Sequence, residues 1–196
     1  MNGESEPVTT YRIRPAREID LIVLQDIERS AGAPFADMGM TSVAEDDPPS
    51  IDSLREFVQN GRAWVSTDGS DRPVAYLLAD VVDGNAHLGQ VSVHSEVMRR
   101  GIGTALLNHM IGWAREHRLP AVTLTTYTHV PWNGPYYERH GFRYLAEHEE
   151  SPGLREIRAA EIAHGLDQWP RACMRRELPP ASRRLSRERN PSSSYR

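Results

Sequence analysis

The stretch AHLGQVSVHSEVMRRGIGTALL, residues 86–107, changes its hydrophobic period in the middle. Before the change, Leu88, Val91 and Val93 are apolar, and β-branched residues prevail, which is typical of a strand. After the change, apolar residues follow helical spacing at Ala105, Leu106, Met110 and Trp113. The sequence therefore predicts a strand, a tight turn and a helix.

The turn between these two elements is Arg-Arg-Gly-Ile-Gly, residues 99–103. The first N–H groups of a helix have no intrahelical partner, and the helix macrodipole makes that end positive, so an anion fits there. The two glycines keep side chains away from these amides, and the two arginines add positive charge. An ordinary turn with glycines for geometry is the alternative. Neither a Walker motif nor a full G-x-G-x-x-G is present, since Leu106 occupies the place of the third glycine.

Length and composition indicate one water-soluble domain. The 196 residues suffice for one hydrophobic core and are few for two domains. Mean hydropathy is −0.57, no segment approaches eighteen consecutive apolar residues, and MNGESEPVTT lacks the features of a secretory signal. We therefore expect a cytoplasmic protein with no membrane partner. The single cysteine, Cys173, is expected to be a buried structural residue, and no Cys/His spacing suggests a metal site.

Charge is distributed unevenly along the chain. All 23 basic residues are Arg, and residues 175–196 contain seven Arg and two Glu, a net charge of +5. Since the whole chain carries −4, residues 1–174 carry −9. An acidic body attracts cationic amines and disfavours nucleic acid. Residues 1–9 are predicted to be flexible, and the Arg-rich tail 179–196, with its Pro and Ser residues, is predicted to be disordered.

Pattern and turn residues predict the remaining elements in chain order. The first helix, residues 18–30, is expected to turn Ile19, Ile22, Val23 and Ile27 to the core. Residues 31–49 are expected to be a loop, after which Ser50 or Asp52 caps a second helix through residue 58. Further strands are expected at 10–14, 63–67, 74–82, 121–126, 141–145 and 172–178, and further helices at 135–140 and 154–164.

The turn and its flanks closely resemble the acetyl-CoA-binding segment of the GNAT superfamily of N-acetyltransferases. The family consensus is [QR]-x-x-G-x-[GA], and this chain has Met98 in the first place. A second segment, residues 137–142, resembles the Y-x-x-x-G-F segment of the same superfamily. The order of elements over roughly residues 10–178 is also that of the GNAT fold. The resemblance implies an α+β domain over residues 10–178, with a mixed, mostly antiparallel twisted sheet of about seven strands and helices on both faces.

The resemblance also assigns roles to individual residues. Tyr137 would protonate the CoA thiolate as it leaves, because a phenol is protonated at neutral pH; Tyr136 is the competing assignment. Asn133 would bind the pantetheine arm or cap the short helix, with capping preferred. Main-chain N–H groups near Val91–Val93 would polarise the thioester oxygen. The expected acetyl-CoA contacts are Val91, Ser92, Val93, Arg99, Arg100, Gly101, Ile102, Gly103, Thr104, Asn133 and Tyr137.

A general base must take the proton of the amine nucleophile. Residues 86–94, AHLGQVSVH, resemble A-H-L-H-x-L-A-V-H of the arylalkylamine N-acetyltransferases, which makes His87 the candidate base. Alternation along the strand predicts that His87, Gly89, Val91 and Val93 share one face. Glu28 or an acid from residues 31–47 is the alternative base, and His94 is expected to position the turn.

Together these features predict direct acetyl transfer from acetyl-CoA to a primary amine, without a covalent enzyme intermediate and without a metal. Phe35, Trp64 and Trp132 suit a small cationic or aromatic amine if they line the site, and are core residues otherwise. Protein or peptide acetylation, for which an open groove would be needed, is the alternative, as is a non-catalytic acyl-CoA-binding module. The sequence leaves open a homodimer and a longer acyl chain.

Overall fold

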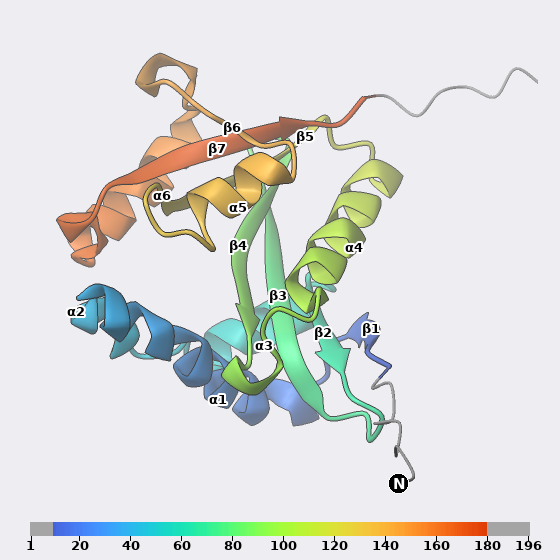
Figure 1. Ribbon diagram of the computed structural model, residues 1–196. Helices are drawn as coiled ribbons and strands as arrows, with labels where there is room; N and C mark the ends of the chain where they lie inside the picture. Colours follow the sequence, from blue (N-terminus) through green and yellow to red (C-terminus); the bar gives the residue numbers. More distant parts are fainter. Residues whose placement is uncertain (1–9, 180–196) are drawn as a thin grey trace, which may run out of the picture.

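The computed structural model describes residues 10–179, so the predicted N-terminus 1–9 and nearly all of the predicted tail 179–196 lie outside the described residues (Figure 1). No helix in this part of the chain is long and apolar enough to cross a membrane. The strands are β1 (Arg12–Pro15), β2 (Ala63–Thr67), β3 (Pro73–Val82), β4 (Asn85–Val93), β5 (Ala121–Tyr127), β6 (Arg143–Tyr144) and β7 (Arg171–Glu177). The α-helices are α1 (Leu21–Gly32), α2 (Thr41–Ala44), α3 (Ile51–Gln59), α4 (Ile102–Glu116), α5 (Gly134–Arg139) and α6 (Pro152–Ala163).

The seven strands form one sheet in the order β1-β2-β3-β4-β5-β7-β6. In the described chain, neighbouring strands are antiparallel except for β4 and β5, which are parallel. A parallel pair needs a crossover connection, and α4 provides it. Asp83 and Gly84, both with positive φ, form the two-residue turn between β3 and β4. These features confirm the predicted α+β fold with a mixed, mostly antiparallel sheet.

The two halves of the sheet separate along β4 and β5. The pairing of these strands covers only Ala86–Leu88 with Val122–Leu124, although both strands continue further. In Figure 1, β6 and β7 lie at the top and β1–β3 toward the bottom right, with the separating strands between them. The second half of β4 therefore has backbone groups that β5 does not pair.

A β-bulge at Gly89 changes which residues of β4 share a face. Leu78 pairs with Gln90, whereas Ala79 pairs with Leu88, so one extra residue is inserted in β4. The alternation reverses at this point, and His87 lies on the face of Gln90 rather than on the face of Val91. The expectation that His87, Gly89, Val91 and Val93 share one face is therefore wrong, because it assumed an unbroken period of two.

Helices cover both faces of the sheet. On one face, α4 buries its apolar side against strand residues such as Leu77, Leu88 and Leu124. On the other face, α1 and α3 pack over Val65 and Tyr76. Each large apolar side chain buried in this way contributes about 1.5–3 kcal/mol to folding before entropy is counted. The buried residues of α4 are Ile102, Leu106, Leu107, Met110, Ile111 and Ala114.

The core-facing side of α1 differs from the prediction. Leu21, Leu24 and Ile27 are buried, whereas Ile19 and Ile22 are 82% and 71% exposed. Ile19 belongs to a 3-10 turn, Glu18–Asp20, that precedes α1, and Ile22 lies about 100° around the helix from Leu21. The prediction is confirmed for Ile27 and for Val23, which packs against the same cluster, and is wrong for Ile19 and Ile22, because it began the α-helix one turn too early.

The segment predicted to be a loop, residues 31–49, contains regular structure. A 3-10 helix, Ala33–Met38, continues α1 and leads into α2. Met40 between them is buried against Tyr127 and Val130. The hydroxyl of Ser50 accepts a hydrogen bond from the Ser53 N–H at 3.1 Å, which confirms Ser50 as the cap of α3. Regular structure here depends on contacts with β5, which local sequence patterns do not reveal.

Candidate active site

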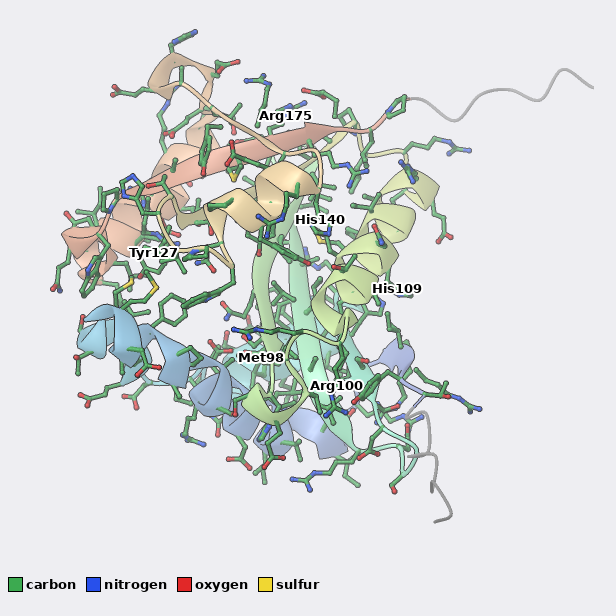
Figure 2. All side chains as sticks on the ribbon, viewed as in Figure 1. Met98, Arg100, His109, Tyr127, His140 and Arg175 are labelled. Atoms are coloured by element: carbon green, nitrogen blue, oxygen red, sulfur yellow. The ribbon has the colours of Figure 1, made fainter. Side chains whose placement is uncertain are left out.

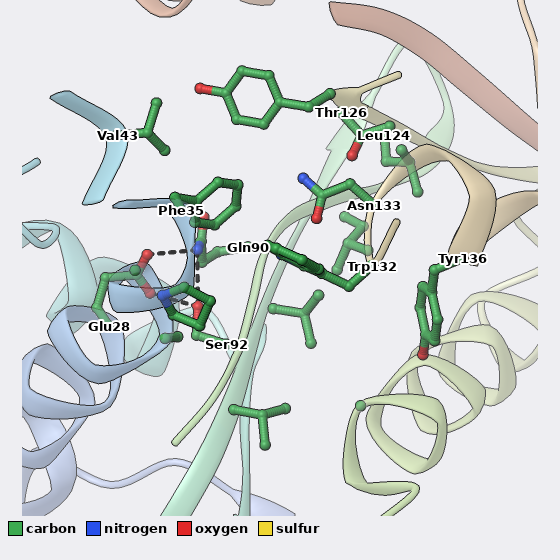
Figure 3. Close-up of a pocket in the computed structure, with 18 of the residues that line it drawn as sticks. Glu28, Phe35, Val43, Gln90, Ser92, Leu124, Thr126, Trp132, Asn133 and Tyr136 are labelled. Atoms are coloured by element: carbon green, nitrogen blue, oxygen red, sulfur yellow. Dashed lines mark hydrogen bonds between the residues drawn. The ribbon is translucent and has the colours of Figure 1, made fainter. Parts of the chain in front are cut away.

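A cavity of about 710 Å³ lies where β4 and β5 separate (Figure 3). Its volume is in the range of small-molecule and cofactor sites. Four parts of the chain line it: α1 with the segment that follows it, the second half of β4 with the start of α4, the end of β5 with α5, and residues at α6 and β7. Most of the residues predicted to contact acetyl-CoA line this cavity, namely Val91, Ser92, Val93, Arg99, Gly101, Ile102, Gly103, Thr104, Asn133 and Tyr137.

The N-terminus of α4 forms one end of the cavity. Gly101 has φ +79° and precedes the first helical residue, Ile102. This left-handed conformation strains any residue with a Cβ, which explains the first glycine of the motif. The protein itself has room for a side chain at Gly103, because a Cβ there would lie 3.6 Å from the Tyr136 hydroxyl, an ordinary contact distance. The backbone conformation therefore requires glycine at position 101. At position 103 the need for glycine is explained by close approach of a ligand to the helix N–H groups.

The two arginines of the turn differ in their surroundings. Arg99 lines the cavity, whereas Arg100 does not and donates a hydrogen bond to the Tyr11 hydroxyl at 3.2 Å. Figure 2 shows Arg100 and Met98 beside the start of α4. Helix N–H groups, unpaired strand backbone and guanidinium groups are suitable partners for a phosphate-bearing ligand with an amide-containing arm. The residues present thus fit acetyl-CoA.

The two adjacent tyrosines of α5 have different environments. Tyr137 is 8% exposed and lines the cavity, and burial raises the pKa of its phenol. Tyr136 also lines the cavity (Figure 3), but its hydroxyl hydrogen-bonds to Thr104 Oγ1 at 3.2 Å and its ring lies 4.3 Å from that of His140. Tyr136 is therefore held by neighbouring side chains, and Tyr137 has the phenol that stays protonated in a buried part of the cavity.

Asn133 directly precedes α5, but its side chain does not cap this helix. It occupies the N-cap position, but its side chain makes no capping hydrogen bond. Its amide instead points into the cavity (Figure 3). The preferred expectation of capping is thus wrong. The backbone φ of −115° and ψ of −108° at Asn133 differ from the extended conformation in which an N-cap side chain reaches the first turn.

His87 lies outside the residues that line the cavity. It is 5% exposed, and its Nδ1 is 3.0 Å from Thr123 Oγ1 on β5. Burial lowers the pKa of its imidazole to about 4, so the ring is neutral at pH 7. His87 lies in the part of β4 that pairs with β5, opposite Thr123, and not in the part where the two strands separate. His94, the residue directly after β4, caps the following turn, with Nδ1 accepting a hydrogen bond from the Glu96 N–H at 3.4 Å.

Glu28, and not His87, is the proton-accepting candidate that lines the cavity. Its carboxylate accepts hydrogen bonds from the hydroxyls of Tyr76 and Ser92, each at 2.5 Å, and from Gln90 Nε2 at 2.8 Å (Figure 3). All three donors are neutral and come from β3 and β4. The sequence offered Glu28 only as an alternative, because 64 positions separate it from Ser92. An acid within the predicted first helix was the only local signal.

Aromatic residues line the part of the cavity opposite the α4 turn. Phe35 and Trp132 do so, but Trp64 lies in the core against Trp113 and His109, at ring distances of 5.5 Å. Tyr127, the last residue of β5, also lines the cavity, although no sequence pattern singled it out. Cys173 is buried with Leu145 and Leu154 on β7, away from the cavity, and burial raises the pKa of its thiol to about 12.

The family identity follows from comparison with known proteins. Residues 25–142 match the sequence model of the acetyltransferase (GNAT) family. The chain belongs to the GNAT acetyltransferase family, whose members transfer an acetyl group from coenzyme A. The match runs from the middle of α1 to the segment just after α5, and therefore includes the α4 turn, Glu28 and Tyr137.

Solved structures of this family have the same fold. The chain is similar to PaiA N-acetyltransferase from Thermoplasma acidophilum in complex with coenzyme A (TM-score 0.64, 12% identity, 86% of this chain and 99% of that chain). A GNAT acetyltransferase from Staphylococcus aureus Mu50 gives a TM-score of 0.66 at 14% identity, with the same coverage. The ribosomal-protein-S18-alanine N-acetyltransferase from Escherichia coli gives 0.62 at 18% identity, covering 90% and 99%. At these identities the likeness establishes the fold.

Proposed function

We propose that residues 10–178 form an N-acetyltransferase that transfers the acetyl group of acetyl-CoA to a primary amine of a small molecule. The main support for this proposal is that Glu28 and Tyr137 line the same cavity as the glycine turn of α4. Acetyl transfer to an amine needs a proton acceptor near the nucleophile and a proton donor near the sulfur. One cavity thus holds a group for each end of the reaction.

In the proposed reaction the amine attacks the thioester carbonyl directly. The new bond is C–N, the bond that breaks is C–S, and the amine proton goes to the Glu28 carboxylate, directly or through water. Backbone N–H groups of Val91–Val93, in the part of β4 that β5 does not pair, stabilise the carbonyl oxygen. Tyr137 donates its proton to the departing thiolate, and solvent returns the protons to their starting places. His87 has no part in these steps.

Glu28 is preferred as the base over the other acids of the cavity for a geometric reason. The carboxylate of Asp46 pairs with His164 at 3.1 Å, and Glu161 pairs with Arg171 at 2.6 Å. Asp47 also lines the cavity but is exposed. Glu28 is bonded instead to neutral groups of β4, the strand that borders the carbonyl. A carboxylate with no cationic partner in its hydrogen-bond set is free to receive a positive ammonium group or its proton.

The test is release of free CoA thiol from acetyl-CoA against small amines, amino acids, aminoglycosides and peptides. The chain gives a low background, because it contains no Lys and its one thiol, Cys173, is buried. We expect turnover with one class of small amine, and a product whose mass is increased by one acetyl group. Turnover with peptides alone would favour a protein acetyltransferase. Binding of acetyl-CoA without turnover on any amine would favour the non-catalytic module.

A further inference from the structure

The two sides of the opening between β4 and β5 carry different groups. The strands stop pairing after Leu88 and Leu124, and the residues beyond this pair line the cavity. On the β4 side, Gln90 donates a hydrogen bond to Glu28. On the β5 side, the first residue beyond the pair is Thr125. Figure 3 shows Glu28 and Gln90 on one side of the cavity and Leu124 on the other.

Thr125 and Gln90 lie on the same face of the sheet. His87 shares the face of Gln90, and its Nδ1 lies 3.0 Å from Thr123 Oγ1, so Thr123 is on this face as well. The pairing of β5 with β7 is regular over Ala121–Tyr127, so Thr125, two residues after Thr123, faces the same way. Groups bonded to Gln90 and groups bonded to Thr125 therefore border the same opening from its two sides.

An ion cluster is attached to Thr125. The Glu161 carboxylate on α6 accepts hydrogen bonds from Thr125 Oγ1 and from Arg158 of the same helix. It also accepts two from Arg171, the first residue of β7, at 2.6 and 3.2 Å. The side chains of Arg158, Glu161 and Arg171 are 17%, 13% and 10% exposed. Two cations and one anion give this cluster a net charge of +1, which is unfavourable at such low exposure unless an anion pairs with it.

Arg171 is the member of the cluster that can meet a ligand. It lines the cavity, whereas Arg158 does not. Its Nε and Nη2 atoms bond to Glu161, and Nη2 also to Thr125 at 3.3 Å, but no hydrogen bond joins Nη1 to another described residue. Nη1 is not among the fully buried side-chain atoms that lack a partner, so it keeps surface that a small molecule can contact. It carries two N–H donors, and one stays available even when the other turns to the phenol of Tyr127, whose ring centre is 4.3 Å from the guanidinium carbon.

The other acids that line the cavity do not supply the missing anion. The carboxylate of Asp46 pairs with His164 at 3.1 Å, and Asp47 is exposed. Glu28 is held on the opposite side of the opening by its bond to Gln90. The cavity therefore offers a negative group to an ammonium on its β4 side and a positive group to a carboxylate on its β5 side.

This pair of charges distinguishes a free amino acid from a peptide. At the N-terminus of a peptide the carbonyl group next to the amine belongs to an uncharged amide, which gives Arg171 no counter-ion. The chain also crosses the far end of the site, where Met40 is buried against Tyr127 and Trp169 packs on the same cluster. An extended peptide needs a groove that continues past the reacting group, so this arrangement favours a compact acceptor.

We propose that the acceptor is a free amino acid, with its amine at Glu28 and its carboxylate bound by Nη1 of Arg171. This inference rests on the proposed acetyl transfer and names its substrate class. Arg171 is a specificity-determining residue, because it binds the carboxylate and moves no proton. Glu161 fixes the orientation of the Arg171 guanidinium, and Arg158 offsets the charge of Glu161, so the positive charge of Arg171 remains available to the ligand.

The first test uses the wild type alone. The twenty L-amino acids, β-alanine and 4-aminobutyrate are tried as acceptors by release of CoA thiol, and the best of them is compared with its own carboxamide. The amide has nearly the same shape and lacks the negative charge. We expect the acid to be preferred by about tenfold or more in kcat/KM, the worth of a hydrogen bond between charged groups, with most of the difference in KM. Equal or better turnover of the amide would overturn the inference while acetyl transfer stands.

The second test removes the guanidinium. Arg171→Gln should lower the preference for the acid over the amide to about one, by raising KM for the acid, and should leave KM for acetyl-CoA unchanged. Arg158 still neutralises Glu161 in this variant. Arg171→Lys keeps the charge and should keep part of the preference. Arg175→Gln is the matched control, since Arg175 lies on the same strand and pairs with Glu177 at 2.6 Å but does not line the cavity.

The outcomes separate this inference from the proposed function. A preference for the acid that persists in Arg171→Gln, or that falls equally in Arg175→Gln, would overturn the inference. Better turnover with peptides, or with amines that carry no carboxylate, would also overturn it. In each of these cases acetyl transfer itself stands. Acetyl-CoA binding without turnover on any acceptor would overturn the proposed function as well.

Discussion

The carboxylate of Glu28 on α1 accepts a hydrogen bond of 2.5 Å from the hydroxyl of Ser92 on β4. This bond joins the helix on one face of the sheet to the part of β4 that β5 leaves unpaired. It places a carboxylate beside the backbone that borders the predicted thioester position. The interaction explains how an acid from α1 comes to line the cavity whose sequence motifs lie at residues 91–142.

The first prediction concerns Glu28. Glu28→Gln removes the proposed proton acceptor and should lower kcat by about 100-fold or more, the usual worth of a general base. The KM for acetyl-CoA should stay the same. Steady-state kinetics with both substrates varied measure both effects. Asp26→Asn on the same helix is the matched control, since Asp26 pairs with Arg29 on the surface. Wild-type kcat in Glu28→Gln would exclude Glu28 as the base.

The second prediction separates the two tyrosines of α5. Tyr137→Phe should lower kcat by about 100-fold, because it removes the proton donor to the thiolate. Tyr136→Phe should keep kcat within a few fold and lose about 1 kcal/mol of unfolding free energy with its bond to Thr104. Burial raises the pKa of Tyr137, so this group should cause no loss of activity below about pH 10. Loss of kcat in Tyr136→Phe alone would reverse the assignment.

The third prediction concerns His87 and stability. Its pKa is about 4 in the folded protein and near 6.5 in the unfolded chain. Between pH 4 and pH 6.5 the His87 ring is protonated in the unfolded chain and neutral in the folded protein. The free energy of unfolding is therefore highest above pH 6.5 and falls as the pH drops toward 4. The loss from this one group is roughly 3 kcal/mol. Chemical denaturation at pH 7 and pH 4.5 should show it in the wild type.

The same residue allows a check on the base. His87→Asn should lose most of the pH dependence of unfolding between pH 4 and 6.5, while the exposed control His148→Asn keeps it. Acetyl transfer at pH 7.5 should survive in His87→Asn, because His87 does not line the cavity. A folded His87→Asn protein with a large loss of kcat and an altered pH–rate profile would restore His87 as the base, as the arylalkylamine-like strand predicts.

The fourth prediction concerns acetyl-CoA. Arg99→Gln should raise KM for acetyl-CoA about tenfold with little change in kcat, because a charge-assisted bond to phosphate holds substrate and transition state alike. The effect should shrink as salt rises. Arg115→Gln, at the other end of α4, is the control with the same change of charge. Equal effects of the two substitutions would show that Arg99 acts only through net charge.

The fifth prediction tests the two glycines of the turn. Gly101→Ala places a Cβ in a left-handed conformation and should lower the unfolding free energy by about 1–2 kcal/mol. Gly103→Ala should leave stability nearly unchanged, because its Cβ makes only ordinary contacts at 3.6 and 3.7 Å. Thermal unfolding of the two variants without ligand measures this difference. Equal destabilisation would contradict the separate reasons given for these glycines.

Local sequence patterns determined the order of strands and helices, the turn at residues 99–103 and the tyrosine segment at 137–142. These features depend on neighbours a few residues apart, where periodicity and glycine positions carry information. The family and most of the predicted acetyl-CoA contacts followed from them. The similarity of residues 86–94 to the arylalkylamine N-acetyltransferases stays a prediction.

Tertiary structure decided which side chains reach the cavity. One extra residue at Gly89 put His87 on the face of Gln90, which sequence periodicity does not reveal, and the pairing of His87 with Thr123 of β5 keeps it out of the cavity lining. Glu28 meets Ser92, and Phe35 meets Trp132, only because the sheet brings distant segments together. The motifs thus predicted from sequence the side of the cavity around the α4 turn, whereas the side with Glu28 and Phe35 depends on packing between segments that share no local pattern.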